Sequence, residues 1–304
     1  MIPDLAVRIG SLALPNPVML ASGTCGYGLE MSPHGDLASL GAVVVKGLSL
    51  APSPGNPPPR IVETPSGMLN SIGLENVGLA AFLADKLPGL RRAGARVIVN
   101  FYGGCRADYR ELAARLDGAA GVHALEMNIS CPNVKRGGLL LGQEPGEVHK
   151  AVAAVRRVTR LPLLVKLTPN VTDVRLTARA AAEAGADALT LINTLQGMAI
   201  DVETRRPALA RVVGGLSGPA IRPVAVRMVW QVRQALSIPL VGCGGVWTAR
   251  DALEFLLAGA TAVQLGTVNF THPGRWVEVV AGISDYLRRH GISRATDLVG
   301  AVSV

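Results

Sequence analysis

The sequence ALEMNISCPNV, residues 124–134, joins an apolar run to a polar turn that carries a thiol. The run 124–129 is typical of a parallel strand buried on both faces, and Pro132 cannot donate a hydrogen bond to a neighbouring strand. We therefore expect the strand to end near Cys131. A free cysteine is often just a small buried hydrophobic residue, but its ordinary pKa of about 8.5 also suits acid, base or nucleophilic chemistry. The surrounding Asn, Ser, Pro and Gly favour the chemical role.

Seven further short runs of this kind occur in the chain, and most are followed by a helical pattern. The eight runs are 18–21, 42–46, 97–101, 124–129, 163–167, 188–193, 239–242 and 262–266. Helical patterns cover 79–87, 109–116, 147–158, 174–184, 224–236, 249–257 and 276–289. Eight alternating units predict a closed (β/α)8 barrel, a TIM barrel of the α/β class, as one domain over residues 1–304. An open doubly wound sheet would alternate similarly but fits eight units less well.

Before the first unit, two short apolar segments, 5–9 and 12–14, flank Gly10-Ser11. This pattern predicts a β-hairpin at the bottom of the barrel.

Composition and charge narrow the possible functions. No apolar run reaches the roughly 18 residues of a membrane-spanning helix, and the N-terminus lacks a signal-peptide pattern, which favours a cytoplasmic protein. The four cysteines are far apart, which argues against a metal site, an iron–sulfur cluster or a disulfide framework on this chain. A net charge of +8 could indicate nucleic acid or an acidic partner, but arginines scattered in pairs over helical segments indicate a solvated surface.

Polar or small residues end every predicted strand, where the active sites of such barrels lie. They are Ser22, Gly23 and Thr24; Lys46 and Gly47; Asn100; Asn128 and Cys131; Lys166; Asn193 and Thr194; Gly244 and Gly245; and Gly266 and Thr267. Turn chemistry explains any one of these residues but not the whole set. The last two pairs follow strands seven and eight, the usual phosphate site of a barrel.

Three connections, 47–77, 132–144 and 195–219, are long enough to be lids or binding loops. The first contains NSIGLEN at 70–76, whose amide side chains suit a planar ligand with carbonyl and N–H edges. An ordinary Asn-rich turn is an equally good explanation of that segment alone.

With these residues assembled, the chain resembles the class 1 dihydroorotate dehydrogenases, which are FMN-containing barrels of pyrimidine biosynthesis. The resemblance covers nearly the whole chain and is most specific at 70–76, at NISCPNVK (128–135) and at Asn193-Thr194. The continuation VKRGG at 134–138 resembles the NAD-linked type B catalytic subunit more than the fumarate-dependent type A. Leu139, Leu140 and Leu141 depart from the pattern, which has an aromatic residue beside Gly142.

The resemblance implies that FMN takes a hydride from C6 of (S)-dihydroorotate while Cys131 removes the C5 proton, which yields orotate. Lys166 is the second catalytic residue implied, beside the pyrimidine edge of the flavin. The implied cofactor-binding residues are Ser22, Lys46, Gly47, Asn100, Asn128, Lys166, Ile192, Gly218, Gly244, Gly245, Gly266 and Thr267. The implied substrate-binding residues are Lys46, Asn70, Ser71, Ile72, Gly73, Leu74, Asn128, Asn193 and Thr194.

Type B enzymes pass their electrons to NAD⁺ through a partner reductase subunit that holds FAD and a [2Fe-2S] cluster. This sequence has neither a dinucleotide fingerprint nor a Cys cluster, so the resemblance implies that such a partner is needed. We expect a homodimer within a heterotetramer, with no membrane or nucleic-acid partner and no metal on this chain. Other candidates are a dihydropyrimidine dehydrogenase-type barrel, a tRNA dihydrouridine synthase and a non-catalytic flavin-binding protein. The tRNA enzymes usually add a C-terminal RNA-binding domain, whereas only residues 292–304 follow the last predicted helix.

Overall fold

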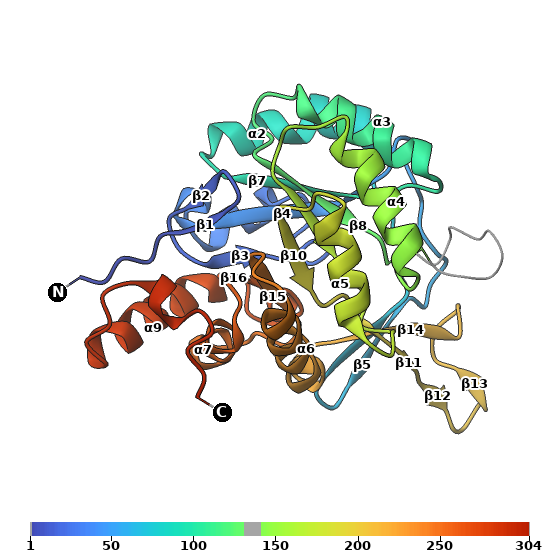
Figure 1. Ribbon diagram of the computed structural model, residues 1–304. Helices are drawn as coiled ribbons and strands as arrows, with labels where there is room; N and C mark the ends of the chain where they lie inside the picture. The colour runs from blue at the N-terminus through green and yellow to red at the C-terminus, as the bar shows by residue number, and fades with distance from the viewer. Residues whose placement is uncertain (1, 131–140, 304) are drawn as a thin grey trace.

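The structure, a computed structural model, describes residues 2–130 and 141–303. Its centre is a closed barrel of parallel strands paired in chain order, surrounded by helices (Figure 1). The barrel strands are β3 (Val18–Leu20), β4 (Ala42–Leu48), β7 (Val97–Phe101), β8 (Ala124–Asn128), β9 (Leu163–Lys166), β10 (Ala188–Leu191), β15 (Leu240–Cys243) and β16 (Ala262–Leu265). The (β/α)8 barrel predicted from the eight apolar runs is confirmed.

Burial explains why these runs form strands. Every residue of β7, β9 and β10 is buried, as expected for strands covered by helices outside and by packed side chains inside. The pairing register places Asn100 opposite Glu126 and Asn128 opposite Lys166. Polar residues of neighbouring strands therefore lie at the same height in the barrel.

The outer helices follow the predicted segments with small shifts at their ends. They are α1 (Gly78–Ala81), the π-helix η3 (Phe82–Lys86), α2 (Leu87–Arg92), α3 (Arg106–Asp117), α4 (Pro145–Arg156), α5 (Val174–Glu183), α6 (Arg222–Ala235), α7 (Ala249–Ala258), α8 (Val268–Thr271) and α9 (Arg275–Arg289). The short 3-10 helices are η1 (Leu29–His34), η2 (Leu37–Ser39), η4 (Pro219–Ile221) and η5 (Ala295–Leu298). The connection from β3 to β4 contains only η1 and η2, and Pro33 lies within η1, where it cannot donate to a helical ladder.

The predicted N-terminal hairpin consists of β1 (Val7–Ile9) and β2 (Leu12–Leu14), which pair antiparallel. Gly10 at its turn has a φ of +55°, and a Cβ there would lie 3.2 Å from the Cβ of Asp187, the residue that precedes β10. The hairpin therefore lies against the N-terminal ends of the strands, at the bottom of the barrel.

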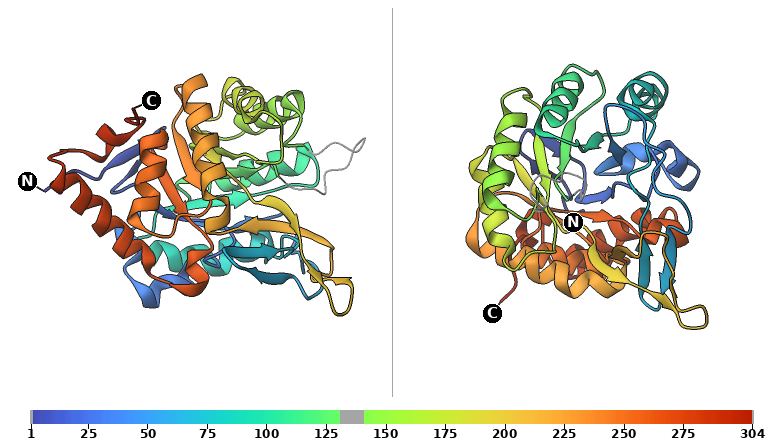
Figure 2. Two further views of the ribbon diagram at one scale, coloured as in Figure 1. Left: turned by 90° about the horizontal axis from the view of Figure 1, so that it is seen from below. Right: turned by 90° about the vertical axis from the view of Figure 1, so that its right-hand side faces the viewer.

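A second sheet lies where the sequence indicated two long loops. It has four antiparallel strands in the order β11 (Leu195–Met198), β14 (Val213–Ser217), β6 (Gly67–Asn70) and β5 (Ile61–Thr64). Gly67 permits the close approach of β6 to the end of β14, because a Cβ there would overlap the Ser217 carbonyl oxygen. The sheet projects from the end of the barrel away from the N-terminus, and its tip is the hairpin of β12 (Ile200–Asp201) and β13 (Arg206–Pro207) (Figures 1 and 2). The loop expectation is thus corrected, because these strands pair across a long sequence separation.

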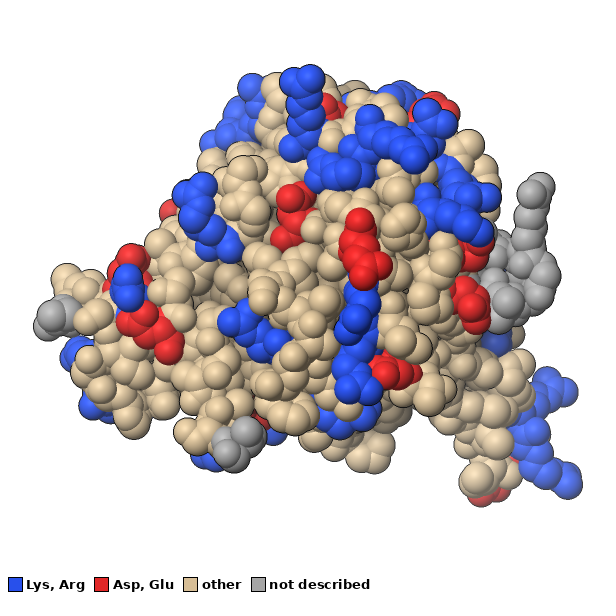
Figure 3. Space-filling view, in the orientation of Figure 1, with Lys and Arg blue, Asp and Glu red and all other residues tan. Residues whose placement is uncertain are grey.

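The surface in Figure 3 shows lysines and arginines spread over several helices, with acidic residues between them. Several pair with acidic neighbours, as Arg175 does with Asp173 and Lys150 with Glu147. Among the described residues, we find no helix with the length and apolar character that crossing a membrane requires.

Candidate active site

The C-terminal ends of β8, β9 and β10 bring the predicted polar residues together at the mouth of the barrel. Asn128, the last residue of β8, accepts at its Oδ1 a long hydrogen bond of 3.4 Å from the Asn193 amide and one of 3.1 Å from the Ser130 backbone. Asn193 in turn accepts a hydrogen bond from the Thr194 backbone amide at 2.8 Å. Asn128 and the pair Asn193-Thr194, predicted at the ends of two different strands, therefore form one chain of contacts.

The second sheet adds Asn70 to this group. The Asn70 amide donates to the Gly215 carbonyl oxygen at 3.3 Å, and a Cβ at Gly215 would overlap the Thr194 hydroxyl. Strand β14 therefore lies between Asn70 and Thr194 and holds both side chains near the strand ends.

Lys166 is buried at the end of β9, with 6% of its surface exposed and no ion pair to any described residue. Burial alone would lower the pKa of its ammonium group, but negative charge at Cys243 and at Glu126 raises it above the ordinary value. Burial also raises the pKa of the Cys243 thiol, so this thiol is neutral near pH 7. Glu126 is therefore the charge that acts on Lys166 under those conditions.

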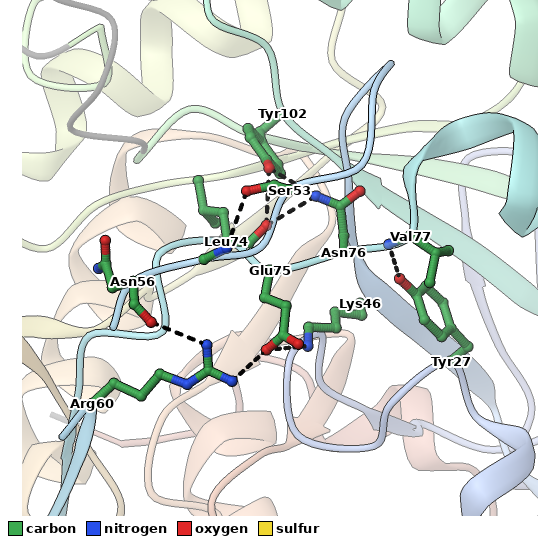
Figure 4. A network of polar contacts seen from close by, with 11 residues as sticks. Tyr27, Lys46, Ser53, Asn56, Arg60, Leu74, Glu75, Asn76, Val77 and Tyr102 are labelled. Carbon is green, nitrogen blue, oxygen red and sulfur yellow. Dashed lines mark hydrogen bonds and ion pairs between the residues drawn. The ribbon is translucent and has the colours of Figure 1, made fainter. Parts of the chain in front are cut away.

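Lys46 has a different environment. It lies within β4, together with Gly47, because this strand continues beyond the predicted end at 46. Its ammonium nitrogen is 3.8 Å from an oxygen of Glu75, which also pairs with Arg60 at 2.6 Å (Figure 4). Lys46 thus links the barrel to the segment 70–76.

Asn76 fixes the end of that segment against the barrel. Its amide donates to the Tyr102 hydroxyl and to the Leu74 carbonyl oxygen, both at 2.9 Å (Figure 4). Its oxygen accepts from the Ser49 and Gly78 backbone amides. Leu74 has a φ of +62°, which a non-glycine residue rarely adopts. The segment therefore has a defined shape that this network maintains.

The proline-rich stretch holds the other end of the segment through Asn56. The Asn56 side chain donates to the carbonyl and hydroxyl oxygens of Ser71, and its backbone amide donates to the Ile72 carbonyl oxygen at 2.9 Å. A Cβ at Gly73 would lie 2.6 Å from the Asn56 nitrogen, so only glycine permits this packing.

Gly245 after β15 and Thr267 after β16 both lie near Gly218. A Cβ at Gly245 would lie 2.9 Å from the Gly218 carbonyl oxygen, and a Cβ at Gly218 would lie 3.6 Å from the Thr267 methyl group. The Thr267 and Ser217 hydroxyls are hydrogen-bonded at 2.8 Å. Backbone and hydroxyl groups thus converge at the usual phosphate position of a barrel.

The remaining predicted cofactor residues are distributed around the same mouth. A Cβ at Gly244 would contact Ile221, whereas a Cβ at Gly266 would lie 3.6 Å from Ala21, the neighbour of Ser22. Ile192 is buried between β10 and Asn193, and the Asn100 oxygen lies beside Gly47.

These groups fit a polar cofactor such as FMN. Within the described ranges, the buried Ser130 hydroxyl and the Gln264 carbonyl oxygen have no hydrogen-bond partner, and Lys166 has no ion pair. Buried polar groups of a native protein are normally satisfied, so these three groups are available to a bound ligand. The described residues contain no group of three or more His, Cys, Asp or Glu side chains that could hold a metal ion.

Cys131 lies outside the described residues, as does the rest of the segment 131–140. Of the other cysteines, Cys105 is exposed, and Cys25 is buried with its thiol directed at two carbonyl oxygens. Burial, supported by Glu30, raises the pKa of Cys25 to about 12. A thiol in this environment stays protonated near neutral pH, so Cys25 is not suited to thiolate chemistry.

Two features of the site were missed in the sequence. Glu126 is a carboxylate inside the barrel, and its position within an apolar run was a usable signal. The hydrogen bond between Asn76 and Tyr102 left no signal in the sequence, because the two residues are 26 positions apart in the chain.

Comparison with known proteins agrees with this geometry. The family model described as dihydroorotate dehydrogenase matches residues 4–287. Proteins called "Dihydroorotate dehydrogenase B (NAD(+)), catalytic subunit" from Pelobacter propionicus and Geotalea daltonii are each 58% identical over 99% of both chains. A crystal structure of the Eimeria tenella dihydroorotate dehydrogenase in complex with ferulenol matches with a TM-score of 0.81 and 25% identity, over 98% of this chain and 88% of that one. A match of this extent, on a barrel with these residues at its mouth, shows that the chain belongs to the dihydroorotate dehydrogenase family.

Proposed function

We propose that this chain oxidises (S)-dihydroorotate to orotate in pyrimidine biosynthesis, as the catalytic subunit of an NAD⁺-linked type B enzyme. The observation that carries the proposal is the contact chain from Asn128 through Asn193 and Thr194 to β14 and Asn70. This chain brings amide and hydroxyl groups of four chain segments together at the mouth of the barrel, which supports a binding site there. The names of the relatives with 58% identity support the same reaction.

In this reaction Cys131 removes the C5 proton as a general base, a role that suits a thiol at the end of a barrel strand. Asn70, Asn128, Asn193 and Thr194 hold the ring and the carboxylate of the substrate, with the backbone of 71–74 as the adjoining wall. When bound, FMN supplies the redox chemistry by accepting the hydride from C6. Lys166 provides a fixed positive charge beside the position where negative charge develops.

The residues that would hold FMN lie around the mouth, at the C-terminal ends of the barrel strands. The phosphate would lie on Gly244, Gly245, Gly266 and Thr267, and the ring system would contact Ser22, Lys46, Gly47, Asn100, Asn128, Lys166, Ile192 and Gly218. The close packing of Gly218 against Gly245 supports this assignment, because it leaves room for backbone groups alone.

We further propose a homodimer that associates with a reductase subunit carrying FAD and a [2Fe-2S] cluster. Exposed apolar side chains on β11 and on the hairpin of β12 and β13 support association at this end of the barrel. Met198, Ile200 and Val202 are 47%, 59% and 77% exposed, and apolar surface of this kind commonly marks protein interfaces.

The purified chain, loaded with FMN, should be reduced by dihydroorotate under anaerobic conditions but should not form NADH at a useful rate. The reason is that its sequence has no dinucleotide fingerprint and no Cys cluster to carry electrons onward. Flavin absorbance measures the first half of the reaction, and NADH absorbance measures the second.

Dihydrouracil, which lacks the carboxylate, is the matched control substrate. Flavin reduction by dihydrouracil at the same rate would favour the dihydropyrimidine dehydrogenase-type alternative. Absence of reduction by dihydroorotate would refute the proposed reaction, and rapid NADH formation by the single chain would refute the two-subunit assignment.

Asn76→Ala should lower the free energy of unfolding by about 1–3 kcal/mol, because buried partners of Asn76 lose their hydrogen bonds. The same change should weaken orotate binding, because the Leu74 carbonyl oxygen loses the bond from Asn76 and keeps only the bond from the Tyr102 hydroxyl. Calorimetry and an orotate titration measure the two effects.

Asn16→Ala is the control for this prediction. Asn16 is also a buried Asn that bonds two backbone groups, Ser39 and Val18, but it precedes β3 at the other end of the barrel. The Asn16→Ala variant should lose about as much free energy of unfolding as Asn76→Ala but should bind orotate with wild-type affinity. Equal orotate affinity in both variants would contradict a role of Asn76 in shaping the site.

A further inference from the structure

Glu126 is a fully buried carboxylate in the interior of the barrel, beneath the predicted cofactor position. One of its oxygens accepts a hydrogen bond from the Asn100 amide at 2.8 Å. The other accepts from the Thr190 hydroxyl at 2.8 Å and from the Gln264 amide at 2.6 Å. The donors come from β7, β10 and β16, so Glu126 joins strands from different sides of the barrel.

All three of these hydrogen-bonding partners are neutral. Lys166 lies on the same inner face of the barrel, because the pairing register places it opposite Thr190, whose hydroxyl bonds Glu126, and opposite Asn128 of the strand that carries Glu126. Its ammonium group interacts electrostatically with Cys243 and Glu126. Since burial keeps the Cys243 thiol neutral near pH 7, the buried ammonium and the buried carboxylate balance each other. Removing either member of such a pair leaves an uncompensated buried charge, which is strongly destabilising.

The charge of Glu126 also decides how the Asn100 amide is oriented. A carboxylate can accept hydrogen bonds but cannot donate them, so Asn100 must direct its NH₂ group inward. Its carbonyl oxygen then faces the mouth, where a Cβ at Gly47 would lie 2.8 Å from it. A glutamine at position 126 would present its own NH₂ group to one of the two neighbouring amides and would favour rotation of that amide.

We propose that Glu126 is a positioning residue of the active site, whose negative charge balances that of Lys166 inside the barrel and keeps the Asn100 carbonyl oxygen directed at the cofactor. This role rests on the proposed flavin-dependent function. A purely structural role for Glu126, as a hydrogen-bond hub inside the barrel, predicts a loss of stability alone.

The first test compares Glu126→Gln with Thr190→Val in the FMN-loaded, substrate-free protein. The midpoint potential of the flavin is measured as a function of pH. The slope of this curve should change at the pH at which Lys166 loses its proton, and that pH is compared between the variants. In Glu126→Gln this pH should fall, because one of the two negative charges that raise the pKa of Lys166 is gone while the other, at Cys243, remains. Thr190→Val removes one hydrogen bond of the hub but leaves the charge, so it should lose stability without moving the change of slope.

Glu126→Asp retains the negative charge and should restore the wild-type profile despite its shorter side chain. The proposal is overturned if the profile of Glu126→Gln coincides with that of the wild type, or if the Asp variant shifts as far as the Gln variant.

A second test needs no flavin. In thermal melts of the apoprotein, the double variant Glu126→Gln/Lys166→Met should have a higher melting temperature than Glu126→Gln alone, because the double variant contains no unbalanced buried cation. If Glu126→Gln does not fold, a folded double variant gives the same support. Additive losses, or a double variant that also fails to fold, would overturn the proposal. Neither measurement uses dihydroorotate. Failure of the proposed role of Glu126 can therefore be distinguished from failure of the proposed reaction.

Discussion

Cys131→Ala should retain its flavin but lose about 10²–10⁴-fold in turnover, the usual contribution of a positioned general base. Proton removal from C5 is disabled in this variant, whereas Gly218, Gly245 and Thr267 at the proposed phosphate position are unchanged. Steady-state rates with dihydroorotate, together with the flavin absorbance of the purified variant, measure both parts of the prediction.

Cys131→Ser is the informative companion variant. A serine hydroxyl is a weaker base at neutral pH than a cysteine thiolate, so activity should recover only at high pH. Near wild-type turnover of the Ala variant at neutral pH would contradict the assignment of Cys131 as the base. Loss of flavin from both variants would instead indicate a role in cofactor binding.

Lys166→Met should lower the midpoint potential of the flavin and slow its reduction by dihydroorotate by about 10²–10³-fold, as removal of one preorganised electrostatic group typically does. Lys166 is buried and makes no close ion pair with a described residue, so its charge can act on a bound group as well as on Glu126. Methionine preserves most of the side-chain volume. Redox titration and anaerobic stopped-flow measurements give the two values.

Lys46→Ala is the contrasting variant, because Lys46 pairs with Glu75 of the segment that would contact the substrate. It should weaken orotate binding as well as disturb the flavin, and Arg should not rescue it, since a planar guanidinium cannot replace a compact ammonium in a tight site. If both lysine variants lose thermal stability while the flavin potential and orotate affinity stay unchanged, the ligand-binding roles of both residues are wrong.

The barrel could be predicted from the sequence because its signals are local. Each strand is a short apolar run, such as 97–101, and the C-terminal ends of parallel strands meet at one end of a barrel wherever the runs lie in the chain. For this reason the order of residues along the chain was enough to place Asn128, Lys166 and Asn193 at a common mouth.

The second sheet could not be predicted, because its pairing is long-range. Strand β6 contains Gly67 and Asn70 and lies in a stretch rich in glycine and proline, and its partner β14 is more than 140 residues away. The ion pair of Lys46 with Glu75 depends on the same tertiary arrangement. Glu126 was overlooked for a different reason: its position within an apolar run was a signal of a buried charge, but only the structure identifies its three hydrogen-bond donors.

The pairing of β6 with β14 also has a consequence for how the protein acquires its site during folding. The hairpin of β5 and β6 emerges early in synthesis, but it has no partner until residues 213–217 have followed. Contacts of such high sequence separation form slowly, because the intervening chain must first lose its conformational freedom. We therefore expect the wall that carries Asn70 to form late, after most of the barrel strands have been made, so that a nascent chain lacks the complete site until its last third is present.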